Sequence, residues 1–251
     1  MPINFKFAYE CKGKRIFVPN DECVRRGEAL IKYCSQAVDF PSYFYHYRAG
    51  GHVAALHRHL EHRFFFRIDI ENFFYSISRN RVSAVLHHIG FRKARPYAEW
   101  SCVKNPFGAP AYSLPIGFVQ SPMLASLAIL RSPVAAAIER AAAAGAFVSV
   151  YFDDFIGSAV DREPLEKAFQ DILHSCQEAN LISNQLKLAK PSEHILAFNC
   201  DLSHGIAEVA EARVAKFFKA PRSQWAEAAF REYCNRVARN NHKSEGRRFL
   251  R

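Results

Sequence analysis

Two adjacent carboxylates between two apolar runs constrain this chain more than any other feature. Asp153 and Asp154 stand between residues 147–152 and 155–158, which are rich in β-branched and aromatic side chains. Such runs favour strands, so we predict a hairpin with both aspartates at its tight turn. Adjacent anions repel unless a cation or basic group lies beside them. Aspartates are also common turn residues, because their side chains bond nearby backbone amides, and the pair alone leaves that structural interpretation open.

A third carboxylate ends another apolar run. Asp69 lies within residues 64–70, which predict a strand, and Phe73 and Phe74 follow it in a segment that turns into helix. If this strand pairs beside the hairpin, three acidic side chains converge on one point. The prediction of an enzyme depends on that convergence.

Three motifs together resemble one family. They are Asp69 followed by Phe73-Phe74, the segment Leu-Pro-Ile-Gly-Phe-Val-Gln-Ser-Pro at 114–122, and Tyr151-Phe152-Asp153-Asp154. In this order they resemble the reverse transcriptases, and three motifs in a family's order seldom agree by chance, although each alone is weak. The resemblance implies an RNA-directed DNA polymerase that adds deoxynucleotides to a 3′-hydroxyl.

The resemblance also implies an α+β right-hand polymerase fold. We expect fingers at 1–60 and 79–115, a palm with an antiparallel sheet packed on helices at 61–78 and 116–204, and a short, basic, helical thumb at 205–251. A thumb this short should hold a duplex weakly. A partner protein, a homo-oligomer or a structured non-coding RNA would then supply additional grip.

The chemistry requires a stronger nucleophile and neutralised phosphoryl charge, which two divalent ions provide. Hard oxygen ligands suit Mg²⁺, with Mn²⁺ as a substitute. By resemblance, Asp69 and Asp153 bridge both ions, Asp154 takes an outer position and the Ile70 carbonyl is a backbone ligand.

Several residues take nucleotide-binding roles by resemblance. Phe74 lies under the nucleotide sugar and would crowd a 2′-hydroxyl, unless it is an ordinary core aromatic. Gly117 and Gln120 belong to the motif that supports the templating base and nascent pair, although a glycine equally allows another backbone to approach. Tyr151 would shape the floor under the primer terminus.

Further candidates lie outside these motifs. Arg48 is a candidate triphosphate contact because guanidinium matches phosphate geometry, or else an exposed loop arginine. Lys187, in Asn-x-x-Lys at 184–187, would lie near the leaving pyrophosphate, or else it is a surface lysine. The predicted primer grip is Phe198, Asn199 and Cys200.

Local patterns predict the remaining elements. Residues 5–18 indicate a basic β-ribbon, Asn20 or Asp21 caps a helix to about residue 38, and helical patterns follow at 82–89, about 97–103 and after Asp161. The inner positions of the first of these helices are expected to be Cys23, Ala29, Leu30, Ile31 and Cys34.

Other local expectations concern single residues. Ser121 with Pro122 predicts a helix start, and residues 194–200 predict one strand. His57, His59 and His62 could bind zinc, but solvated or template-contacting histidines fit the spacing better. The thumb should pack through Trp225, Phe230 and Tyr233.

The chain is basic, which favours a polyanionic partner such as an RNA template or a DNA primer. Its formal net charge is +10, and residues 211–251 carry eleven Lys or Arg against four Glu, 11 − 4 = +7. Seven cysteines without a C-x-x-C pair suggest neither a disulfide framework nor a thiolate zinc site, and a reducing cytoplasm fits. The amino terminus lacks an apolar signal region, and no run approaches membrane-spanning length.

One departure concerns the branch of the family. Many retroviral, intron and retron enzymes carry Pro-Gln-Gly-Ser-x-x-Ser-Pro, whereas Ile116 and Phe118 stand at the glutamine and serine positions here. This form resembles the abortive-infection and defence-associated bacterial enzymes, next to the retron-like ones. Their members differ in template use, so a template-independent nucleotidyl transferase, a nucleic-acid-binding subunit and an antiviral sensor remain alternatives.

Overall fold

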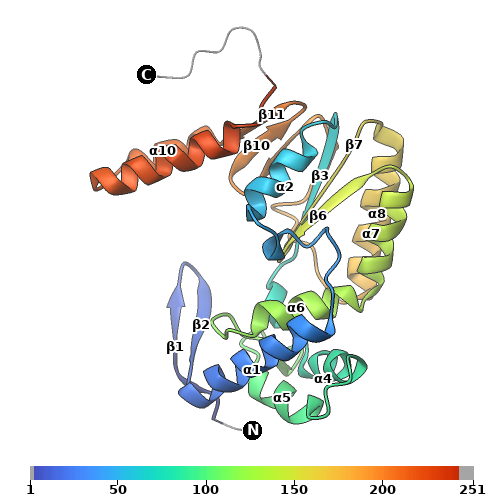
Figure 1. Ribbon diagram of the computed structural model, residues 1–251, viewed down its shortest axis with the longest axis vertical. Helices are drawn as coiled ribbons and strands as arrows, with labels where there is room; N and C mark the ends of the chain where they lie inside the picture. Colours follow the sequence, from blue (N-terminus) through green and yellow to red (C-terminus); the bar gives the residue numbers. More distant parts are fainter. Residues whose placement is uncertain (1–2, 243–251) are drawn as a thin grey trace. The chain divides into compact units, whose positions relative to one another are not determined.

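A computed structural model describes residues 3–242, which divide into two compact units (Figure 1). Among these residues, unit 1 comprises 3–44, 69–138 and 172–184, and unit 2 comprises 45–68, 139–171 and 185–242. The expected basic segment at 211–251 therefore lies partly outside the described residues. The fingers, palm and thumb boundaries remain predictions, and we describe each unit by itself.

Unit 1 is mainly helical, with two short β-hairpins. Its complete elements are β1 (Phe5–Cys11), β2 (Lys14–Pro19), α1 (Asp21–Ala37), α3 (Phe73–Ser76), α4 (Arg79–His88), α5 (Ala94–Ser101), β4 (Val103–Lys104), β5 (Tyr112–Ser113) and α6 (Ser121–Leu130). The unit division falls within α7 (Pro133–Ala143) and α8 (Arg162–Glu178).

The predicted β-ribbon and the helix after it are confirmed. β1 and β2 pair antiparallel, and the Asn20 side chain caps α1 by accepting a hydrogen bond from the Cys23 N–H at 2.9 Å. The buried positions of α1 are Cys23, Gly27, Leu30 and Cys34. Ala29 is exposed, so the prediction that it faces the core was wrong. The buried residue next to it is Leu30, which lies on the buried face of the helix.

Helix α6 begins differently from the sequence prediction. Its N-cap residue is Gln120, and Ser121 is the first helical residue, buried with its hydroxyl unpaired among the described atoms. Pro122 still lies in the first turn, where its missing N–H leaves no bond unmade. The helix starts one residue early because a turn precedes it, in which the Ser121 N–H donates to the Phe118 carbonyl at 3.2 Å and Gln120 already has helical backbone angles, φ −85° and ψ −13°.

Unit 2 contains most of the β-structure. Its elements are η1 (Tyr45–Tyr47), α2 (Gly51–His59), β3 (Phe64–Asp69), β6 (Phe147–Tyr151), β7 (Asp154–Ala159), β8 (Ala189–Ser192), β9 (His194–Ala197), β10 (Cys200–Ser203), β11 (Ile206–Val209), α9 (Glu211–Phe218) and α10 (Gln224–Ala238). Four strands form a sheet in the order β6-β7-β3-β8, and three form another in the order β11-β10-β9. Asp69, the last residue of β3, is grouped with unit 1.

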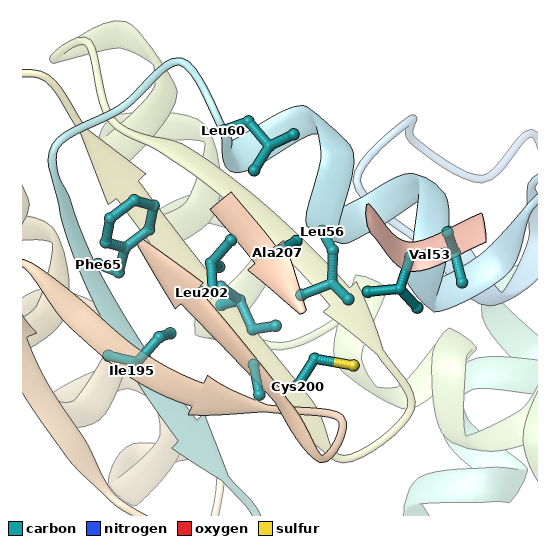
Figure 2. Packing of buried hydrophobic residues seen from close by; sticks show 11 residues of the cluster. Val53, Leu56, Leu60, Phe65, Ile195, Cys200, Leu202 and Ala207 are labelled. Atoms are coloured by element: carbon teal, nitrogen blue, oxygen red, sulfur yellow. The ribbon is translucent and has the colours of Figure 1, made fainter. Parts of the chain in front are cut away.

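Neighbouring phenylalanines of β3 point to opposite faces of its sheet, as strand alternation requires. Phe65 packs in a buried cluster with Leu56 of α2 and Leu202 of β10 (Figure 2). Phe66 packs on Phe169 of α8, 5.4 Å between ring centroids. Gly157 allows this, because a Cβ there would lie 2.1 Å from the Phe66 ring.

The segment 194–200 is a hairpin and not the single strand expected. β9 ends at Ala197, which pairs with Cys200, and the two residues between them have positive φ, +54° at Phe198 and +59° at Asn199. Two positive φ values define a type I′ turn, whose twist matches that of the paired strands. The turn chemistry was missed because Phe-Asn is an unusual sequence for it.

The carboxyl-terminal helices differ from expectation at one residue. Phe230 of α10 is buried and stacks on Phe217 of α9 at 4.0 Å, whereas Trp225 is 87% exposed. Trp225 is therefore not a packing residue of this region. Figure 1 shows α10 beside α2, where His57 Nε2 lies 2.8 Å from the Val237 carbonyl.

No single helix in residues 3–242 is long and apolar enough to cross a membrane. Within the part of the chain that the structure describes, α6 and α7 are long and apolar enough when taken together, but the pair is bent by 63°. The residues of α6 are almost all buried, as in the core helix of a globular protein.

Candidate active site

The predicted carboxylate hairpin is present, and its tip is strained. Tyr151 pairs with Asp154, so the turn consists of Phe152 and Asp153, and Asp154 is the first residue of β7. Phe152 has φ +54°, whereas Asp153 has no positive φ. This pattern defines a type II′ turn, whose first central position favours glycine. Holding a phenylalanine there costs on the order of 1 kcal/mol or more.

Asp154 has a basic partner that the sequence analysis did not single out. Arg67 of β3 donates from Nε to Asp154 Oδ1 at 2.7 Å, and its Nη2 lies 2.6 Å from the same oxygen. Arg67 Nη1 also donates to the Leu196 carbonyl of β9 at 3.1 Å. One guanidinium thus links β3, the start of β7 and β9.

Aromatic rings surround the hairpin tip. The tip cluster consists of His46, His52, Tyr151, Phe152 and Phe198. His46 stacks on Phe152 with centroids 4.3 Å apart, and Tyr151 lies 5.5 Å from Phe198. Two predicted site residues, the Tyr151 floor and the Phe198 grip, are therefore neighbours. Cys200, also predicted in the grip, is buried in the cluster against which Phe198 packs.

Burial sets the protonation of the cluster histidines. It lowers the pKa of His46 to about 4, against the opposing effect of a backbone hydrogen bond with Val150. The pKa of His52 is lowered by burial and then by Arg236. Both rings are therefore neutral at neutral pH, and His52 Nε2 lies 3.0 Å from the Tyr233 hydroxyl.

Asp69 is buried at the start of a paired segment within unit 1. Its carbonyl accepts from the Asn184 N–H at 2.8 Å, and Ile70 pairs with Ser183. A backbone hydrogen bond thus joins Asp69, which opens the Asp69-Phe73-Phe74 motif, to Asn184, which opens the Asn-x-x-Lys motif. Lys187 itself is exposed in a turn before β8.

Two other candidates lie in ordinary packing environments. Phe74 is half-buried beside Phe73, with centroids 5.3 Å apart. Arg48 lies 5.0 Å above the Tyr45 ring and lines a pocket with His57 and Arg58. Their roles toward the nucleotide remain predictions.

Gly117 and Gln120 pack against other parts of unit 1. Gly117 has φ +109°, and a Cβ there would lie 2.2 Å from the Phe17 carbonyl oxygen, so backbone approach explains this glycine. Gln120 is buried, donates to Ser101 Oγ at 3.3 Å and lies against Gly27. A nucleotide contact by Gln120 would require its amide to leave this position.

His59 is neither a zinc ligand nor solvated in this structure. It is fully buried, with Nδ1 2.6 Å from Ser158 Oγ and Nε2 2.8 Å from Ser149 Oγ. Serine hydroxyls on adjacent strands satisfy both ring nitrogens. The histidine connects α2 to the carboxylate hairpin as a core residue.

A three-ligand metal cluster is not formed within residues 3–242, where no group of three or more His, Cys, Asp or Glu could hold an ion. The predicted ligands belong to two units, Asp69 to the first and the tip aspartates to the second. Their donor atoms are hard carboxylate oxygens, which suit magnesium. Arg67 already occupies one oxygen of Asp154, which is compatible with an outer role for that residue.

Comparison with known proteins identifies the fold and family. Residues 16–200 match the family "Reverse transcriptase (RNA-dependent DNA polymerase)". The chain belongs to the reverse transcriptase family. The foamy viral protease-reverse transcriptase solved with ds DNA is similar, with TM-score 0.50 and 14% identity over 88% of this chain and 33% of the viral one. The chain thus spans about a third of that protein.

A truncated apo telomerase from Candida tropicalis is also similar, at TM-score 0.43 and 12% identity over 72% of this chain and 42% of the telomerase. No curated protein sequence matches the chain. The family match and the viral structure confirm the predicted α+β polymerase fold, with its antiparallel sheet packed on helices.

Sequence reasoning missed Arg67, His46 and His52. Arg67 carried a usable signal, because it is a charge inside an apolar strand and lies two residues before Asp69, on the same strand face. His46 and His52 carried no such sequence signal, because the residues that they contact are about a hundred positions away or more.

Proposed function

We propose that this reverse transcriptase-family chain is an active RNA-directed DNA polymerase that extends a primer with deoxynucleotides. The family match over residues 16–200 carries the proposal. The two adjacent carboxylates support it, since Asp153 lies in a strained turn and Asp154 follows it directly at the start of β7.

Asp69, Asp153 and Asp154 are the proposed holders of two Mg²⁺ ions, with the Ile70 carbonyl as a further ligand. The chemistry of the set supports this assignment, because all three side chains end in hard carboxylate oxygens, which suit Mg²⁺. When bound, the ions would lower the pKa of the primer hydroxyl and neutralise phosphoryl charge.

The chain's own residues have separate tasks. Asp153 presents its carboxylate from the turn, and Arg67 orients Asp154 through the contact at 2.6 Å. Tyr151 and Phe198 meet edge to face, with planes 72° apart, and either ring can offer a face on which a primer base stacks. Phe74 is proposed to select deoxynucleotides and Lys187 to meet the leaving pyrophosphate.

Primer extension tests the proposal. Purified chain with Mg²⁺, deoxynucleotides and a DNA primer on RNA should extend the primer, and Asp153→Asn should reduce extension by at least about a hundredfold, because one neutralised ligand weakens metal binding and phosphoryl neutralisation. Asp39→Asn, an exposed aspartate after α1, is the matched control. Equal activity of Asp153→Asn and wild type would contradict the assignment, and products made without template would favour the template-independent transferase.

We also propose a role in bacterial antiphage defence, on narrower grounds. The form Ile-Gly-Phe-Val-Gln-Ser-Pro at 116–122, which resembles the defence-associated branch, supports it. Cells carrying the wild-type chain with its native neighbouring genes should survive phage challenge better than cells carrying Asp153→Asn. Equal survival would contradict this role without affecting the polymerase assignment.

A further inference from the structure

The strained residue of the hairpin tip has one neighbour that contacts both its backbone and its side chain. The Phe152 N–H donates to His46 Nδ1 at 3.2 Å. The two rings stack with centroids 4.3 Å apart and planes 25° apart. His46 belongs to η1, 106 residues earlier in the chain.

His46 is itself held in place by other rings. Tyr47 lies 4.3 Å from it, and Tyr151 approaches edge-on at 5.9 Å. The histidine therefore offers a fixed acceptor and a fixed flat surface to a residue whose left-handed backbone is unfavourable by itself.

We propose that His46 is a positioning residue that keeps Phe152 in its left-handed conformation and thereby orients Asp153, the next residue. This inference rests on the proposed polymerase function for its catalytic consequence, but not for its structural part. The direction of the Asp153 carboxylate depends on the backbone angles of the turn. If Phe152 relaxed to a negative φ, the Asp153 carboxylate would point in a different direction. Misplacement by about 1 Å can cost about a hundredfold in rate.

Two substitutions separate the ring of His46 from its hydrogen bonds. His46→Asn keeps an acceptor near Nδ1 and removes the ring, whereas His46→Phe keeps a ring and removes the acceptor for Phe152 together with the hydrogen bond to Val150. We expect kcat to fall about tenfold or more in His46→Phe, with the KM for deoxynucleotide changed less than about twofold, because only the alignment of Asp153 is affected. His46→Asn should retain more activity than His46→Phe. His174→Phe, at an exposed site on α8, is the control.

A double-mutant cycle with Phe152→Gly gives the decisive result. Glycine adopts positive φ without cost, so the need for His46 should disappear. In the Phe152→Gly background, His46→Phe should lower the melting temperature and kcat much less than in wild type. Equal losses in both backgrounds would overturn the inference, because His46 would then act elsewhere.

The cycle also separates this inference from the proposed function. The melting-temperature measurements of the cycle need no nucleotide or template. They therefore measure the coupling between residues 46 and 152 even in a chain that does not polymerise. An inactive wild type with coupled stability would overturn the polymerase assignment alone. An active wild type with additive effects would overturn the role of His46 alone.

Discussion

His59 has a role in the structure that its position in the sequence does not indicate. In the sequence it is one of three histidines that suggested solvent or template contact. In the structure it is fully buried, and two serine hydroxyls satisfy both ring nitrogens. Burial, with the nearby His62 and Arg58, lowers the pKa of His59 to about 3.

This shift makes stability depend on pH in a defined window. The unfolded His59 binds a proton below about pH 6.5, while the folded one does so only near pH 3. The unfolded state therefore binds more protons in between, and the free energy of unfolding should fall as pH falls from about 6.5, by up to about 1.4 kcal/mol per pH unit. Denaturant unfolding at several pH values measures it.

His59→Gln removes the titration and is the comparison variant. It should be less stable at pH 7, because its amide cannot reproduce both hydrogen bonds. Its stability should fall less steeply toward pH 4. Some slope should remain, because burial also lowers the pKa of His46 to about 4. Identical slopes in the two proteins would show that His59 does not contribute.

At the scale of elements, the carboxyl-terminal helices behave as packed parts of unit 2. α10 contacts α2 through His52–Tyr233 and His57–Val237, and α9 packs on α10 through Phe217 and Phe230. The aromatic residues of the two helices are divided between the core and the surface. Phe230 is 8% exposed and Trp225 is 87% exposed.

That difference predicts opposite outcomes for two similar truncations. Phe230→Ala should cost about 3 kcal/mol of unfolding free energy, because it leaves a cavity between α9 and α10. Trp225→Ala should change it by no more than about 0.5 kcal/mol. Urea unfolding of both variants measures this. A large loss in Trp225→Ala would indicate contacts made outside the described residues.

At the scale of the whole molecule, charge is the property that bears on partners. The net charge is +10 in 251 residues. On α10, Arg231 and Arg236 lie over aromatic rings, 5.3 Å from Phe218 and 5.9 Å from Tyr233. Arginines held in this way lose little conformational freedom when they contact phosphate.

Binding to nucleic acid should therefore depend strongly on salt. Neutralised phosphates release counterions, so affinity for a primer–template duplex should fall by a factor of about 10 or more between about 50 and 200 mM salt. Fluorescence anisotropy with a labelled duplex measures it. An affinity independent of salt would contradict electrostatic binding by this basic chain.

The sequence by itself determined the features that neighbouring residues produce. These are the carboxylate hairpin, the β-ribbon, the Asn20 cap and the three motifs in family order, because turns, alternation and caps depend on residues a few positions apart. Tertiary structure alone decided the features that join distant residues. Arg67 reaches Asp154 and His46 reaches Phe152 across 87 and 106 positions, while Gln120 and His59 are buried and Trp225 is exposed. Such contacts follow from how elements pack, and no local pattern encodes the partner.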